Sequence, residues 1–149
     1  MRLKQQIEAD IKLAMLAREK EELTALRSIK SAIMLAETEK GASAEISDEA
    51  EMKILTRAAK QRKDSAELYA KEGRPDLESI ERNELEVIGR YLPKQLSQDE
   101  LKSELESIIA RIGASSAQDM GKVMGISTKE LAGKADGKAI SEMVRNLLN

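Results

Sequence analysis

The feature that most constrains the fold is the spacing of the apolar residues, which recur every three or four positions along nearly the whole chain. Leu3, Ile7 and Ile11 begin this pattern, and the same spacing returns after each glycine or proline break. Such spacing places apolar side chains on one face of an α-helix. Strands would lack their usual packing residues, because Val occurs only three times and Phe and Trp are absent. The sequence therefore predicts an all-α protein.

Glycine and proline divide the first part of the chain into four expected helices. The first carries Leu3 to Met15 on its apolar face, and the second runs from about residue 23 to Lys40, where Gly41 stops it. Ser47 is the expected N-cap of the third helix, which extends to about residue 72. The fourth begins after Gly73 with Pro75 in its first turn and has Ile80, Val87, Ile88 and Tyr91 on its apolar side, until Pro93 ends it.

Three shorter helices are expected after Pro93. Ser97 and Glu100 form a capping-box pattern before the fifth helix, which Gly113 closes. Ser115 or Ser116 caps the sixth, which continues to about residue 131, and Asp136 caps the last. We therefore predict an N-terminal four-helix bundle over residues 1–92, a hinge over 93–96, and a small three-helix domain over 97–149.

Missing residue types exclude much common chemistry. Without His or Cys the chain has no Ser-His-Asp triad, thiolate nucleophile, imidazole metal ligand or disulfide. We therefore expect no catalytic residue, metal site or cofactor. The net charge of −2, from 25 basic and 27 acidic residues, argues against a strongly basic polymer-binding protein. No signal peptide or apolar membrane span is apparent, so a cytoplasmic location without membrane partners is expected.

Three basic residues form a stripe in the expected third helix. Lys53, Arg57 and Lys60 fall within about 60° of one another around the helix axis. The stripe is a secondary candidate for phosphate contacts, although a solvated helix face explains it equally simply. No aromatic residue lies beside it to stack on bases.

Arg62 and Glu84 each occupy a position where the apolar stripe of their helix calls for an apolar residue. Two opposite charges on the buried sides of bundle helices are expected to pair, because an isolated buried charge is costly. Glu84 as a general base is the alternative, but no nucleophile or cofactor motif accompanies it. We predict a structural ion pair.

Four lysines lie close together near the C-terminus: Lys122, Lys129, Lys134 and Lys138. Between residues 120 and 138 they face only two acidic residues, which gives a local charge of +2. Gly121 and Gly125, four residues apart, are expected beside the apolar side of the helix, where they let another helix approach closely. The lysines are expected on the opposite side. A solvated surface needs no further explanation, so the charge supports nucleic-acid binding only weakly.

Five motifs, in order, resemble the YqeY family over essentially the whole chain. They are Lys60-Gln-Arg-Lys-Asp-Ser65, Tyr91-Leu-Pro-Lys-Gln-Leu96, Gly113-Ala-Ser-Ser116, Asp119-Met-Gly-Lys-Val-Met-Gly125 and Gly133-Lys-Ala-Asp-Gly137. The second half is similar to the tail domain of the B subunit of tRNA-dependent amidotransferase, the GatB/YqeY domain. The resemblance implies a small, cytosolic, all-helical protein whose family carries an amidotransferase-like label: carbon-nitrogen ligase activity with glutamine as nitrogen donor.

The same resemblance implies a binding role more than a reaction. In the amidotransferase the tail contacts tRNA, whereas the parts that hydrolyse glutamine and activate the aminoacyl group have no counterpart here. Its transferable positions are the motif lysines, Lys122, Lys134 and Lys138. The leading interpretation is a non-catalytic module that binds tRNA or a tRNA-handling assembly, with no DNA partner expected. The alternatives are a protein-protein adaptor without RNA contact, which would show an exposed apolar groove, and an amidotransferase-type enzyme.

Overall fold

All regular structure in the described part of the chain is helical, which confirms the all-α prediction. The computed structural model describes residues 2–41 and 45–149, so part of the break expected after Gly41 lies outside the described residues. The helices are α1 (Leu3–Ala17), α2 (Lys20–Lys40), α3 (Asp48–Lys71), α4 (Pro75–Gly89), α5 (Gln98–Ile112), the 3₁₀ turn η1 (Ala117–Asp119), α6 (Met120–Glu130) and α7 (Gly137–Leu148). The chain forms two compact units, Met1–Leu92 and Pro93–Asn149.

Side-chain caps fix where several helices begin. Ser47 Oγ accepts a hydrogen bond from Ala50 N at 3.1 Å at the start of α3. At the start of α5, Ser97 and Glu100 form the complete capping box, in which each side chain accepts from the other residue's main-chain N–H at 3.1 Å. Asp136 caps α7 by accepting from the N–H of Lys138 at 3.3 Å. These polar residues satisfy N–H groups that the first helical turn leaves without partners.

Two helix ends differ from the sequence expectation. The α-helical part of α4 stops at Gly89, and Arg90, Tyr91 and Leu92 continue as turns in which each N–H bonds the carbonyl three residues earlier. The sixth helix starts later than expected, because Ser116 caps the 3₁₀ turn η1 and α6 begins only at Met120. The side chain of Asp119 folds back onto the main chain there and accepts from Ser115 N at 2.9 Å.

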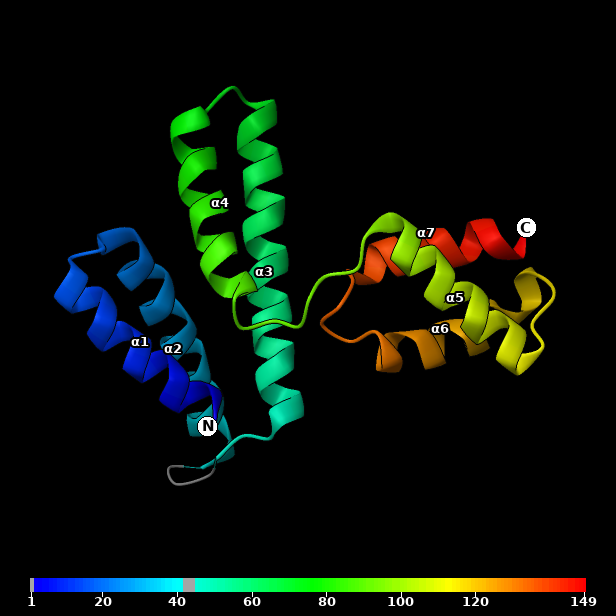
Figure 1. Cartoon of the computed structure of the whole chain (residues 1–149), viewed down its shortest axis with the longest axis horizontal. Helices are drawn as coiled ribbons and strands as arrows, with labels where there is room; N and C mark the ends of the chain where they lie inside the picture. Colours follow the sequence, from blue (N-terminus) through cyan, green and yellow to red (C-terminus); the bar gives the residue numbers. More distant parts are fainter. Residues whose placement is uncertain (1, 42–44) are drawn as a thin grey trace. The chain divides into compact units, whose positions relative to one another are not determined.

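The first unit consists of two helical hairpins, α1–α2 and α3–α4, joined chiefly through α2 (Figure 1). Its core draws on all four helices, with Ile7, Leu26, Ile29, Ile33, Leu55 and Ile88 almost fully buried. Because α1 packs mainly on α2, the arrangement is more open than a bundle in which every helix contacts two neighbours. The openness leaves Met15 and Ile80 about half exposed, at 54% and 50%, although the sequence placed both on buried faces.

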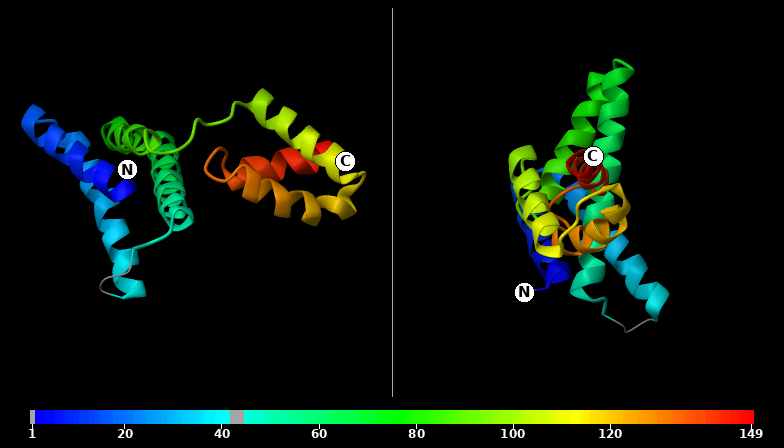
Figure 2. Two further views of the ribbon diagram at one scale, coloured as in Figure 1. Left: turned by 60° about the horizontal axis from the view of Figure 1, so that its bottom comes forward. Right: turned by 90° about the vertical axis from the view of Figure 1, so that its right-hand side faces the viewer.

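The second unit packs α5, α6 and α7 around one small core (Figure 2). Helix α5 contributes Leu101, Leu105 and Ile108, and the rest of the unit contributes Val123, Leu131, Ile140, Val144 and Leu148. The segment expected as a hinge is tied to this unit, because Leu96 N donates to Lys134 O at 2.9 Å and Gln95 Nε2 to Gly133 O at 2.6 Å. These bonds hold the turn before α7, where the candidate Lys134 lies.

Candidate functional site

The four candidate lysines lie on one continuous stretch of the second unit. Lys122 and Lys129 belong to α6, Lys134 lies in the turn after it, and Lys138 is the second residue of α7. All four side chains are exposed. Within the described residues, none of them lies within 4.0 Å of a carboxylate as an ion pair. Their charges are therefore available to a partner.

The acidic residues of the same stretch are occupied by contacts within the unit. Asp119 accepts hydrogen bonds from the N–H groups of Ser115 and Ser116, and these bonds lower the pKa of its carboxyl group. Both oxygens of Glu130 lie 2.8 Å from one guanidinium nitrogen of Arg111. Asp136 caps α7. These carboxylates keep their negative charge, but each is held by contacts other than an ion pair with one of the four lysines.

Gly121 and Gly125 share the exposed face of α6 with the lysines, which corrects the expectation that glycines and lysines lie on different sides. Both glycines are exposed, and no neighbouring element lies within 4 Å of the position that a Cβ atom would occupy at either one. No other helix of the described chain therefore uses them for close approach. They line a shallow groove of about 690 Å³ with Ile112, Ile126, Lys122, Lys129 and Glu130.

The secondary basic stripe lies in the other unit, on α3. Lys53, Arg57 and Lys60 are all exposed, and Lys53 Nζ lies 3.8 Å from Glu49 Oε1 one helical turn earlier. Arg57 and Lys60 form no ion pair among the described residues. None of the grooves described here lies beside the stripe, whose role in phosphate contacts stays a prediction.

Arg62 and Glu84 do face each other across α3 and α4. Arg62 Nε lies 2.9 Å from Glu84 Oε2, and a second guanidinium nitrogen lies 3.6 Å from Glu81 Oε2, a partner that the sequence did not indicate. The side chains are half-buried, since 27% of Arg62 and 14% of Glu84 is exposed. Arg62 also donates to Ser28 Oγ of α2 at 3.3 Å. Arg62 and its partners therefore connect α2, α3 and α4, and they are more exposed to solvent than a fully buried ion pair.

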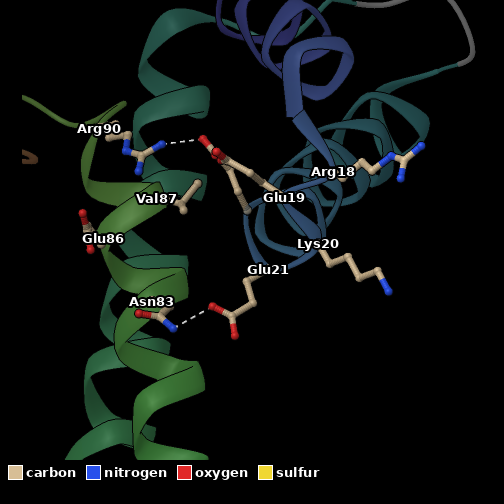
Figure 3. A pocket seen from close by; sticks show the side chains of 9 residues that line it. Arg18, Glu19, Lys20, Glu21, Asn83, Glu86, Val87 and Arg90 are labelled. Atoms are coloured by element: carbon tan, nitrogen blue, oxygen red, sulfur yellow. Dashed lines mark hydrogen bonds and ion pairs between the residues drawn. The ribbon is translucent and has the colours of Figure 1, made fainter. Parts of the chain in front are cut away.

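Two clefts, of about 490 and 540 Å³, flank the contact between the α1–α2 corner and the end of α4. Arg90 pairs with Glu22, and Asn83 donates to Glu21 Oε2 at 2.9 Å (Figure 3). A hydrogen bond between the carboxyl groups of Glu19 and Glu22 raises the pKa of Glu19 and lowers that of Glu22, which Arg90 lowers further. Glu21 and Glu22 therefore have partners at α4, whereas Glu86 forms no ion pair among the described residues.

Tyr91, which follows the end of α4, lines the second cleft and contacts α1. Its hydroxyl donates to Asp10, and burial, this hydrogen bond and the nearby carboxylate all raise the pKa of the phenol. Arg18 and Lys20 point away from α4 into solvent (Figure 3). The clefts therefore contain a polar helix-helix contact, and no group of three or more acidic residues in the described chain is suited to hold a metal ion.

Comparisons with known proteins agree with the resemblance seen in the motifs. A model of the family described as "Yqey-like protein" matches residues 4–148. The chain is also 35% identical over 113 residues to a protein of Clavispora lusitaniae (strain ATCC 42720) named "Altered inheritance of mitochondria protein 41, mitochondrial". That similarity covers 74% of this chain and 65% of the relative, so the chain spans less than two thirds of the relative's length. In the described residues, no helix is both long and apolar enough to cross a membrane.

Proposed function

We propose that the second unit of this chain, which belongs to the YqeY family, binds tRNA or a tRNA-handling assembly. The contact surface consists of Lys122, Lys129, Lys134 and Lys138, which we call the lysine surface. The unit acts by binding and performs no reaction. The family label of carbon-nitrogen ligase activity then describes relatives that contain catalytic parts, and not this chain alone.

One observation carries the proposal: the four lysines have no ion-pair partner among the described residues, whereas Asp119, Glu130 and Asp136 are all engaged. An unpaired lysine ammonium gains most from a phosphate, because no internal contact is lost when it binds. Structured RNA is recognised largely through the shape of its backbone, so the shortage of aromatic side chains does not argue against it.

The chemistry of the chain supports a binding role. The sequence has no His or Cys, and three carboxylates around the clefts of the first unit contact Arg90, Asn83 or Tyr91. Purified protein should therefore neither hydrolyse glutamine nor amidate misacylated tRNA. Turnover that disappears when a residue of this chain is replaced would refute the non-catalytic role.

The binding test compares two triple variants with equal loss of charge. The first replaces Lys122, Lys134 and Lys138 by Gln, and the second replaces Lys53, Arg57 and Lys60 by Gln in the first unit. Affinity for a bulk tRNA preparation is measured at several salt concentrations. Each phosphate contact contributes roughly 0.7–0.9 to the slope of log affinity against log salt. We expect a smaller slope for the first variant only, with both melting temperatures nearly unchanged because exposed lysines contribute little to stability. Equal slopes for the wild type and the first variant would remove the lysine surface from consideration.

A protein adaptor is the second candidate function, and the groove on α6 favours it. Ile112 and Ile126 give this groove an apolar floor, which phosphate binding does not require. A pulldown from lysate with and without ribonuclease separates the two functions, since a tRNA-dependent assembly is lost on ribonuclease treatment. The groove also permits a more specific inference.

A further inference from the structure

The groove on α6 contains two glycines that the unit itself does not need. Gly125 lies in the interior of the 11-residue helix α6, where glycine costs about 0.5–1 kcal/mol relative to alanine, and Gly121 lies in its first turn. Their backbone has ordinary helical geometry, since the glycines with positive φ are Gly41, Gly73, Gly113 and Gly133. Space for a side chain is open at both positions. Neither backbone conformation nor internal packing therefore explains them.

The groove itself has an apolar floor and a cationic rim. Ile112 at the end of α5 and Ile126 of α6 are half-buried and form the floor beside the two glycines. Lys122 and Lys129 are seven residues apart, so they lie on the same side of α6 with about 10.5 Å of helix rise between them. Glu130, which also lines the groove, pairs with Arg111 and forms no ion pair with either lysine in the described chain.

We propose that this groove binds an amphipathic α-helix of a partner protein. The partner helix presents small and apolar residues to Gly121, Gly125 and the two isoleucines, and it carries carboxylates about two turns apart that pair with Lys122 and Lys129. Glycines let two helix backbones approach closely, and an apolar floor stabilises the buried stripe of such a helix. The proposal goes beyond RNA binding and does not depend on it.

The lining favours a helix over an RNA strand as the occupant. Gly125 lies past the first turn of α6, where the main-chain N–H groups bond within the helix, so exposing the backbone at this glycine offers phosphate no additional donor. Close approach to α6 therefore favours a partner that is stabilised by van der Waals contact, such as a helix. Contact with Ile112 and Ile126 adds to that stabilisation. The two lysines then select an acidic partner through charge complementarity.

The test uses two synthetic helical peptides of about five turns that share one alanine- and leucine-rich stripe. One peptide has glutamates flanking the stripe at two-turn spacing, and the other has lysines at the same positions. Each is titrated into the ¹⁵N-labelled full chain, and amide shifts are followed by NMR, which detects even weak binding. We expect saturable shifts around residues 112 and 121–129 with the glutamate peptide and none with the lysine peptide.

Two variants with equal added bulk show whether the groove is the binding site. Gly125→Leu fills the groove, whereas Ser103→Leu places a large apolar side chain on the exposed face of α5, outside it. We expect Gly125→Leu to weaken binding of the glutamate peptide by at least about tenfold, since the leucine occupies the space of the partner helix, and Ser103→Leu to have no effect. Gly125→Ala, which adds one methyl group, should weaken it less.

Several results would overturn the proposal. They are the absence of saturable shifts with the glutamate peptide, equal binding of both peptides, and unchanged binding by a folded Gly125→Leu variant. Reduced tRNA affinity of Gly125→Leu without any peptide binding would identify the groove as an RNA contact, and the proposed partner helix would then be wrong. If the Lys122, Lys134 and Lys138 variant binds tRNA as the wild type does, the lysine surface is refuted. The peptide titration of the wild-type chain does not depend on that result, so the two proposals fail separately.

Discussion

Replacing the groove glycines by alanine should stabilise the second unit. Gly121→Ala and Gly125→Ala put a methyl group into open space, since no neighbouring element comes within 4 Å of the place that the new Cβ atom takes at either residue. No steric cost therefore offsets the gain in helix propensity. Alanine also lowers the conformational entropy of the unfolded chain at these positions.

The size of the effect follows from these terms. Gly125→Ala should add about 0.5–1 kcal/mol to the free energy of unfolding, the helix-propensity difference reduced slightly by exposure of the new methyl group. Gly121→Ala should add less, because residue 121 lies in the first turn of α6. A gain of about 1 kcal/mol raises the melting temperature of a domain of this size by about 4–8 °C. The double variant should approach the sum of the two changes.

Gly113→Ala is the matched control. Its surroundings are equally open, but its φ is +70°, in the left-handed region, where a side chain costs about 1–2 kcal/mol. The same substitution should therefore destabilise the unit at residue 113 and stabilise it at residues 121 and 125.

Calorimetry of the full chain, with amide hydrogen exchange in α5 and α7, assigns each change to the second unit. Destabilisation by Gly125→Ala would refute the reasoning, because it would mean that the glycine serves the packing of its own unit. The inference of an external partner would then lose its first observation.

Three further predictions concern polar groups. In urea unfolding, Arg62→Gln should lower the free energy of unfolding by about 2 kcal/mol and Glu84→Gln by about 1 kcal/mol. The first change leaves two carboxylates without their cation, whereas the second leaves Arg62 near Glu81, so equal losses would contradict this explanation. Ser127→Ala should stabilise by about 1 kcal/mol in the same assay, since the buried Ser127 hydroxyl has no hydrogen-bond partner among the described residues; a loss of stability would indicate an undetected partner. The hydrogen bond from the Ser97 N–H lowers the pKa of the Glu100 carboxyl group. The bond therefore stabilises the unit at pH values above the usual carboxyl pKa, and this stabilisation is lost as the pH falls through the lowered pKa. The difference in melting temperature between the wild type and Glu100→Gln should accordingly shrink between neutral pH and about pH 3, and a difference independent of pH would contradict this.

Much of the helical structure could be predicted because it depends on local rules. The periodicity located the core of the second unit, and Ser47, Ser97 and Asp136 cap the helices that they were expected to cap. The exposure of Met15 and Ile80 could not be predicted in this way. Both lie on the apolar side of their helices, but whether a neighbouring helix covers that side depends on how the two hairpins spread apart.

The candidate sites show the same limit. Opposite charges at misfit positions indicated the contact between Arg62 and Glu84, but not the second carboxylate of Glu81 or the partial exposure of the group. The shared face of the glycines and lysines on α6 could have been predicted from the helical repeat. At about 100° per residue, the groove residues of α6 from Gly121 to Lys129 span only about 140°. That arithmetic cannot show whether another helix covers the face, which required the three-dimensional packing.

The lysine surface and the groove overlap only in part, and this has a consequence for both proposals. Lys122 and Lys129 line the groove, whereas Lys134 and Lys138 lie beyond the end of α6 and take no part in it. A docked acidic helix would neutralise the first pair and leave the second pair free. RNA that relies on the α6 lysines must therefore compete with the helix, while RNA held by the lysines around residues 134–138 can bind beside it. Because an acidic partner also repels phosphate nearby, even the second arrangement should lower the affinity for RNA at low salt, and screening should remove that penalty as the salt concentration rises.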